Sequence, residues 1–170
     1  MTQNDFNPYP FVKIHEEGRT FYDFETDHEV RYRAYFSDYN YMFGTHDLGC
    51  NILSFDLVVV GALRPPRGTP TDDRLADTVR TVFIKIFEEV ENVVIAVYDS
   101  SDQGELARRR KFGQWFNESD TDYIEKVDFE MPGDDYALVS SIFLHTALLN
   151  KEAVLDRYTL VLEGGNIPLD

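Results

Sequence analysis

A continuous apolar run from Val93 to Val97 constrains the fold of this chain more than any other feature. An acidic turn over residues 99–102 follows it, and then a helix-like segment that carries the basic run Arg108–Lys111. Consecutive apolar residues are typical of a central strand that is covered on both faces. We therefore expect a buried strand over residues 92–98, an exposed turn, and an amphipathic helix over residues 103–116.

The other elements are predicted from the spacing of apolar residues. Alternating or continuous apolar positions indicate five further strands, over residues 20–25, 29–37, 51–60, 123–131 and 136–145. Apolar residues at helical spacing indicate a long helix over residues 72–90. Residues 150–163 fit either a helix or a strand, and Asn150 as a helix N-cap favours the helix.

The element order is therefore βββ-α-β-α-ββ-α, which is an α+β fold. Because most strands adjacent in sequence are joined as hairpins, we expect a mostly antiparallel or mixed sheet with two to three helices on one side. A chain of 170 residues suits a single domain, which we place at residues 20–163. Residues 1–19 are poorly patterned, with Pro8 and Pro10 as breakers, and residues 164–170 form a C-terminal tail.

The composition excludes several classes of protein. The chain has 31 acidic and 16 basic side chains, a net charge of −15, which repels nucleic acid and favours a basic protein partner. No apolar window is long enough to span a membrane, and no signal-peptide pattern opens the chain. The single cysteine, Cys50, excludes an intrachain disulfide. We therefore expect an acidic, soluble, cytoplasmic protein.

Three segments, FYDFETDHEVRYRAYF, VVIAVYDSSDQGELARRRKFGQWF and SSIFLHTALLNKEAVLDRY, resemble a group of small uncharacterised bacterial proteins. The group is a domain of unknown function that is common in Bacteroidetes, and the resemblance spans most of residues 20–162. It implies an α+β fold and a bacterial source. It implies no activity, so no catalytic residue is carried over from it.

The turn between the buried strand and the following helix carries Asp99 and Asp102. Two neighbouring carboxylates could bind a divalent cation, but the sequence offers no spaced third and fourth oxygen ligand. The structural alternative is a helix cap at Asp102 and turn chemistry at Asp99. The turn is therefore a candidate ligand site, with helix capping as the competing explanation.

Other chemical signals are weak. The four histidines and Cys50 do not form a zinc-ligand pattern, so we expect no metal and no cofactor. Ser140 and Ser141 lie within a predicted strand rather than in a nucleophile elbow, and the chain has no phosphate loop. The net charge also disfavours nucleic-acid binding by the basic run Arg108–Lys111. The sequence gives no catalytic signature, which argues against an enzyme.

The densest aromatic cluster contains Tyr32, Tyr35, Tyr39 and Tyr41. On alternating strand positions half of these side chains would point outward, and exposed tyrosines beside charges are common anchors of protein interfaces. The alternative is that they pack under the loop over residues 38–48.

Two functions from different classes follow. The first is a non-enzymatic protein-binding module of the inhibitor, immunity or antitoxin kind, which uses carboxylates and tyrosines to cover a basic partner. The second is a metal-assisted enzyme or small-ligand-binding protein that uses the turn from Asp99 to Asp102. Self-association into a homo-oligomer is open under both.

Overall fold

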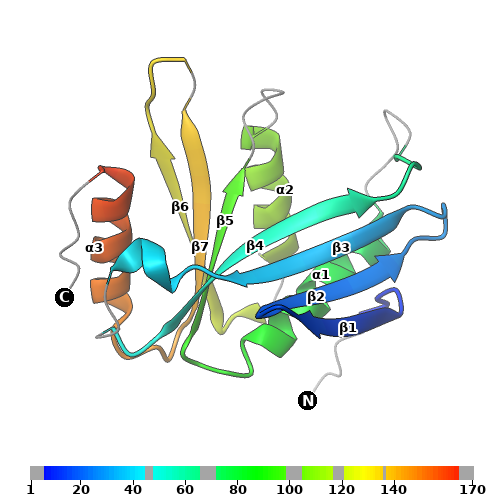
Figure 1. The fold of residues 1–170 in the computed structure, drawn as a ribbon, viewed down its shortest axis with the longest axis horizontal. Helices are drawn as coiled ribbons and strands as arrows, with labels where there is room; N and C mark the ends of the chain where they lie inside the picture. The colour runs from blue at the N-terminus through cyan, green and yellow to red at the C-terminus, as the bar shows by residue number, and fades with distance from the viewer. Residues whose placement is uncertain are drawn as a thin grey trace.

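The computed structural model describes residues 6–44, 48–65, 72–98, 105–116, 121–135 and 137–164, with the side chains of residues 105–108 left aside. Its elements, in chain order, are β1 (Phe11–Glu16), β2 (Arg19–Glu25), β3 (Arg31–Asp38), the 3-10 helix η1 (Asn40–Phe43), β4 (Asn51–Val60), α1 (Asp73–Ile86), β5 (Asn92–Tyr98), α2 (Glu105–Phe116), β6 (Ile124–Met131), β7 (Leu138–His145) and α3 (Lys151–Leu162) (Figure 1).

All the strands belong to one seven-stranded sheet in the order β1-β2-β3-β4-β5-β7-β6. Neighbouring strands are antiparallel except β4 and β5, which run parallel over Asn51–Phe55 and Asn92–Ala96. Helix α1 lies in the connection between these two strands, because parallel neighbours need a long crossover. The structure thus confirms the α+β fold, the mixed sheet and the order of the elements, and it adds β1 in front of them.

Helices α1 and α2 pack on one face of the sheet. The centre of this core is Phe83 of α1, which is fully buried and contacts the rings of Phe36, Phe55, Phe116 and Phe143 at centroid distances from 4.8 to 5.7 Å. Aromatic rings at this spacing bury large apolar areas in edge-to-face or tilted contacts. These aromatic contacts therefore hold α1 and α2 against β3, β4 and β7.

Helix α3 and η1 cover the other face, over β5, β7 and β6 (Figure 1). Val93 and Ile95 of β5 belong to this second core, whereas Val94 and Ala96 belong to the first. The expected covering of the central strand on both faces is confirmed. The expected placement of all helices on one side of the sheet is wrong, because an apolar run with side chains on both faces needs a cover on each.

Some boundaries differ from the sequence prediction. Helix α1 ends at Ile86, and the next residue, Phe87, closes the helix with a backbone hydrogen bond to Phe83 rather than extending it to residue 90. The segment 150–163 contains the helix α3, as expected. Asn150 stands at the N-cap position, but its side chain makes no capping hydrogen bond; it donates instead to the carbonyl of Leu48 at 3.2 Å. None of the helices in the described part of the chain is long and apolar enough to cross a bilayer.

The strand β1 lies in the segment that appeared poorly patterned. It pairs with β2 from Phe11–Phe24 to Glu16–Arg19. The preceding residue Tyr9 is buried, and its hydroxyl donates to the carboxylate of Asp72 at 2.7 Å. The N-terminal segment is therefore fixed in two ways. Strand β1 pairs with β2, and Tyr9 bonds to Asp72 at the start of α1.

Candidate binding surface

One face of the strands β1 to β4 has no described α-helix over it, because α3 covers only the β5, β7 and β6 side (Figure 1). We call this surface the open face. Strand alternation and the cross-strand registers place on it the side chains of Val12, Phe21, Asp23, Arg33, Tyr35, Asp56, Val58 and Val60. The opposite side chains of the same strands, such as Tyr22, Ala34 and Phe36, enter the core under α1.

Arg33 is the most constrained side chain of the open face. Its Nε and Nη2 atoms donate to the two carboxylate oxygens of Asp23, each at 2.6 Å. The guanidinium also lies 5.1 Å from the ring centroid of Phe21 and 5.8 Å from that of Tyr35. Hydrogen bonds to Asp23 and Tyr35 raise the pKa of Arg33, so the charge is permanent. The surface thus holds a fixed cation between two rings and a carboxylate.

Phe21 and Tyr35 form an edge-to-face pair beside this cation, with centroids 4.8 Å apart. Phe21 is buried, and Tyr35 is half-buried. Aromatic side chains that keep part of their surface exposed lose little conformational entropy on binding, which makes them frequent interface anchors. Tyr35 is therefore the tyrosine of the predicted cluster that suits a binding role best.

The other predicted tyrosines lie elsewhere. Tyr32 is on the opposite face of β3, stacked on Phe24 at 5.6 Å. Tyr39 and Tyr41 lie at η1 and form an edge-to-face pair at 5.5 Å, with Tyr41 the most exposed at 72%. Burial raises the pKa of Tyr39. The structure therefore places Tyr35 on the open face and Tyr39 and Tyr41 at η1, and it separates Tyr32 from all three.

Several valines that the sequence analysis did not single out also line this side of the sheet. Val12, Val58 and Val60 are 63%, 38% and 37% exposed, and Val97 of the neighbouring β5 is 44% exposed. Val58 and Val60 lie two residues apart on one face of β4, whereas Asp23 and Arg33 separate them from Val12. Neighbouring exposed apolar side chains, such as Val58 and Val60, are a feature of interaction sites. The signal was present in the sequence as the run Leu57–Val60, but the pattern alone did not show that half of it faces solvent.

A notch opens where β4 and β5 separate. Their pairing ends at Phe55 and Ala96, although β4 continues to Val60 along β3. Between the diverging strands lies a hollow of about 370 Å³. It is lined by residues of β4, β5 and α2: Phe55, Asp56, Leu57, Val58, Ala96, Val97, Tyr98 and Phe112. Desolvation raises the pKa of Asp56 at this place. The notch joins the open face at Asp56 and Val58.

A buried polar network lies on the other face of the sheet, beneath α2. The hydroxyl of Tyr98 donates to Ser141 Oγ at 2.9 Å, and Ser141 donates to Asp128 Oδ1 at 2.5 Å. Lys126 pairs with the same carboxylate. Because Ser141 is fully buried, it has no access to a substrate. Ser140, which is also buried, accepts from the hydroxyl of Tyr158 at 2.8 Å on the opposite face. Both serines therefore satisfy buried tyrosines rather than forming a nucleophile.

The protonation of this network is set by its surroundings. Burial raises the pKa of Tyr98 to about 12. Burial would also raise the pKa of Asp128, but hydrogen bonds from Lys126 and Ser141 outweigh it and hold the pKa below its ordinary value. The tyrosine is thus neutral and the carboxylate charged at neutral pH.

The turn from Asp99 to Asp102 lies outside the described residues, so the structure does not test the ligand site proposed for it. Of the basic run, Arg109 forms an ion pair with Glu130 at 3.4 Å, and Lys111 lies 5.4 Å from the ring centroid of Trp115. Trp115 itself is buried at 5% exposure. Arg109 and Lys111 are therefore engaged within the molecule, whereas Arg110 is exposed. The indole is a core side chain.

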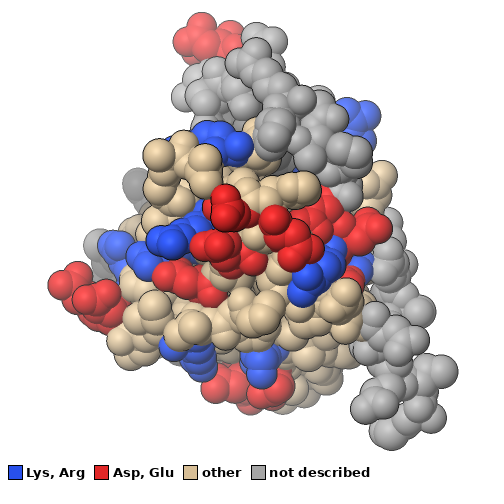
Figure 2. Space-filling model, turned by 90° about the vertical axis from the view of Figure 1, so that its right-hand side faces the viewer, with Lys and Arg blue, Asp and Glu red and all other residues tan. Residues whose placement is uncertain are grey.

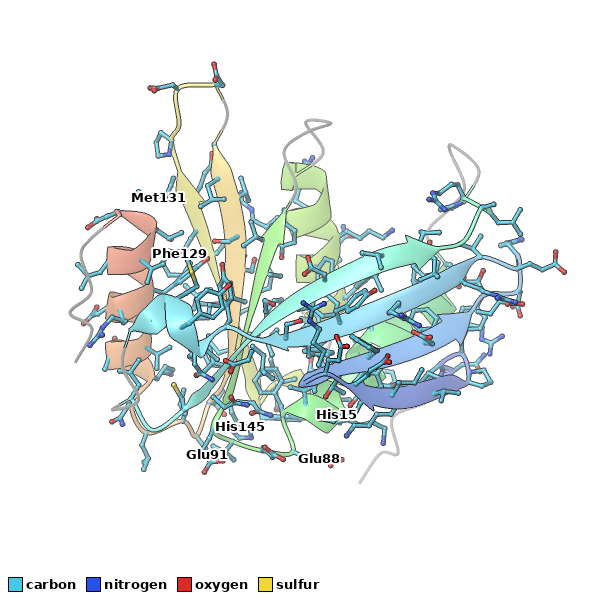
Figure 3. The ribbon with its side chains drawn as sticks, viewed as in Figure 1. His15, Glu88, Glu91, Phe129, Met131 and His145 are labelled. Atoms are coloured by element: carbon cyan, nitrogen blue, oxygen red, sulfur yellow. The ribbon has the colours of Figure 1, made fainter. Side chains whose placement is uncertain are left out.

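Among the described residues no group of three or more His, Cys, Asp or Glu side chains could hold a metal ion. Figure 3 shows His15, Glu88, Glu91 and His145 at one end of the molecule, on β1, on the connection between α1 and β5, and on β7. His15 Nδ1 lies 3.2 Å from the hydroxyl of Thr20, and His145 Nδ1 accepts from the backbone N–H of Ala147 at 3.0 Å. These histidines therefore have local structural partners.

Charge at the end where β2 and β3 are joined is locally balanced. Figure 2 shows acidic and basic side chains interspersed over this end of the sheet. Arg31 pairs with Glu25 at 2.9 Å, and Arg74 pairs with Asp27 at 3.2 Å. Exposed pairs of this kind contribute about 0 to 1 kcal/mol each. The surplus of negative charge is therefore not concentrated at this end.

A second hollow, of about 380 Å³, lies between the β6–β7 hairpin tip and the end of α3. Met131, Leu138 and Leu162 form its apolar part, and Asp134 and Asp135 lie at its rim. Figure 3 places Met131 on the strand edge near α3. Neither of these two aspartates has an ion-pair partner among the residues that the structure describes. The tip of this hairpin thus contributes negative charge without an ion-pair partner among the described residues.

Comparison with known proteins gives a single result. A family model described as a family of unknown function (DUF6169) matches residues 71–159, from the start of α1 into α3. No curated protein matches the chain, and no solved structure matches it. The strands β1 to β4, which form the open face, lie before the matched region.

Proposed function

The chain belongs to this family of unknown function, and we propose that it is a protein-binding module that contacts a basic partner through the open face. The observation that carries the proposal is the sheet surface that no helix of the described part of the chain covers. It combines the anchored cation of Arg33, the ring of Tyr35 and the exposed valines Val12, Val58 and Val60. A soluble domain rarely leaves such apolar and aromatic surface open unless another molecule covers it.

The chemistry of the surface suits a protein better than a small ligand. Side chains lie along a broad strand surface, and the rings of Phe21 and Tyr35 are supported by neighbouring side chains rather than enclosed in a deep cavity. Interfaces combine an apolar and aromatic centre with a polar rim. Here Tyr35, Val58 and Val60 would form the apolar part. The pair of Asp23 and Arg33, which lies between Val12 and Val58 in the cross-strand register, would form polar contacts within the surface.

The basic character of the partner is inferred from the charge of the whole chain, which is −15. A field of this sign accelerates the approach of a cationic protein and slows that of an anionic one. The same argument supports an inhibitor, immunity or antitoxin role, in which the module masks a basic functional surface. A bacterial, cytoplasmic setting belongs to this proposal as well.

The test is a tagged capture at low salt from a bacterial host that carries the gene, followed by mass spectrometry. Tyr35→Ala removes the exposed ring of the open face, and Tyr123→Ala is the matched control, because Tyr123 is a half-buried tyrosine that contacts His145 on β7. We expect a stoichiometric basic protein with wild type and with Tyr123→Ala, and its loss with Tyr35→Ala. Equal capture by all three proteins would refute a role for the open face.

A further inference from the structure

The edge of β4 that faces the notch is the most unusual feature of the sheet. Strand β4 pairs with β3 from Leu53 to Val60, but its pairing with β5 stops at Phe55. The stretch Asp56–Val60 therefore has one paired edge and one edge without a strand partner among the described residues. An interior strand of a seven-stranded sheet does not normally present such an edge.

The direction of the backbone groups on this edge follows from strand alternation. The N–H of Asn51 donates toward β5, to the carbonyl of Glu91 at 2.9 Å, whereas the carbonyl of Ile52 accepts from Tyr39 at the end of β3 at 2.9 Å. The register between β3 and β4 has no bulge up to Val60. Because backbone groups alternate along a strand, those of Leu57 and Val59 point toward the notch.

Beyond Asp56, this edge lacks the features that usually prevent pairing. Exposed edges are commonly protected by charged side chains, prolines or bulges. The run Leu57–Val60 is a leucine followed by three valines, which have high strand propensity, and it contains no charge and no proline. The hollow of about 370 Å³ in front of it provides room beside the edge.

We propose that an extended segment of the partner protein adds to β4 as a further strand beside the notch. It would pair with the backbone groups of Leu57 and Val59, which have no strand partner on this side among the described residues. This inference rests on the proposed function and names the form in which the partner is bound. Binding by strand addition takes its affinity from main-chain hydrogen bonds and its specificity from alternate side chains.

The lining of the notch defines the chemistry of that segment. On one side of the sheet the added strand would meet Tyr98 and Phe112, and on the other it would meet Val58 and Val97. Apolar side chains are therefore expected on both faces of the segment. A Lys or Arg is expected where the segment passes Asp56, because the attraction of a cation would offset the cost of desolvating this carboxylate.

The probe is a phage-displayed library of random linear peptides, followed by calorimetric titration of an enriched peptide. Val59→Pro removes the notch-facing N–H and leaves the pairing with β3 intact, since proline is tolerated on free strand edges. Val59→Thr is the matched control of similar shape. We expect enriched peptides to bind wild type and Val59→Thr alike, and Val59→Pro at least about tenfold more weakly, from the lost hydrogen bond and the bulk of the ring.

Amide hydrogen exchange on the wild type gives a readout that does not depend on the folding of the proline variant. The amides of Leu57 and Val59 should exchange quickly in the free protein and become protected when the enriched peptide is added. Strand addition is wrong if no peptide is enriched above an unrelated control protein, if Val59→Pro binds as well as wild type, or if these amides gain no protection.

The two proposals fail separately. A partner that Tyr35→Ala loses and Val59→Pro retains would leave the open face as the binding surface and exclude strand addition. A partner that Val59→Pro loses and Tyr35→Ala retains would support strand addition and exclude Tyr35 as an anchor.

Discussion

Arg33 and Asp23, on the neighbouring strands β3 and β2, are joined by two hydrogen bonds of 2.6 Å, one to each carboxylate oxygen. The pair stands opposite in the register of the two strands, so it fixes the guanidinium against Phe21 and Tyr35. Bidentate pairs of this kind are more directional than single ion pairs. The open face therefore presents a prearranged surface rather than a set of mobile side chains.

Replacement of this carboxylate should loosen the open face without unfolding it. Asp23→Asn keeps the shape but removes the charge, and we expect a loss of about 1 to 2 kcal/mol in the free energy of unfolding. Urea unfolding measures the loss, with Glu25→Gln as the control, because the pair of Glu25 with Arg31 is more exposed. A loss for Glu25→Gln as large as that for Asp23→Asn would contradict a special role of the bidentate pair.

A substitution in the aromatic core should lower the free energy of unfolding more than Asp23→Asn does. Phe83→Ala opens a cavity between α1, α2 and the sheet, and large-to-small changes at such sites cost about 3 to 5 kcal/mol. Thermal and urea unfolding both report this change. Leu160→Ala, at a site that is 49% exposed, is the control and should change stability little. A small effect of Phe83→Ala would show that the first core is not organised around this ring.

The charged carboxylate of Asp128 should stabilise the folded protein at neutral pH but not in acid. Its pKa is lowered in the folded protein, so folding is favoured while the group is charged. The contribution is present above the ordinary carboxyl pKa and is lost as the pH falls below about 4. Unfolding curves measured across this range should show a shallower acid limb for Asp128→Asn than for wild type. Identical pH dependence for the two proteins would contradict the inferred shift.

The burial of Tyr98 should make the free energy of unfolding fall at high pH, which is the opposite direction from the effect of Asp128. Burial raises the pKa of Tyr98 to about 12, so the folded protein holds this proton more tightly than the unfolded chain does. The resulting stability is present below about pH 10, where a free tyrosine ionises, and is lost as the pH rises from there toward 12. Spectrophotometric titration of tyrosinate should show one late-ionising tyrosine fewer in Tyr98→Phe. An unchanged titration curve would exclude the shift.

Much of the fold could be predicted because its signals are local. The run from Val93 to Val97 identifies a strand that is covered on both faces, and the helical spacing within residues 72–90 identifies α1. The position of α3 could not be predicted, since it depends on which face of the sheet lacks a cover. Asn150 shows the same limit, because a good N-cap residue forms a tertiary hydrogen bond to Leu48 instead.

The candidate surface was predicted only in part, for a related reason. Alternation along β3 separates Tyr32 from Tyr35, but only the packing of α1 on one face shows which of them is left at the surface. The free edge of β4 could not be read from the chain at all. A strand and its partner look alike in sequence whether they stay paired to the end or diverge, as β4 and β5 do after Phe55 and Ala96.

Hydrogen exchange of the complex with the captured partner, detected by mass spectrometry, tests the central claim most directly. The account predicts that protection on binding falls on β1 to β4 and on the end of β5 that faces the notch, with the largest change around Tyr35 and over Leu57–Val59. Protection confined to the β6–β7 hairpin and α3, with no change in β2 to β4, would contradict the open face as the binding surface.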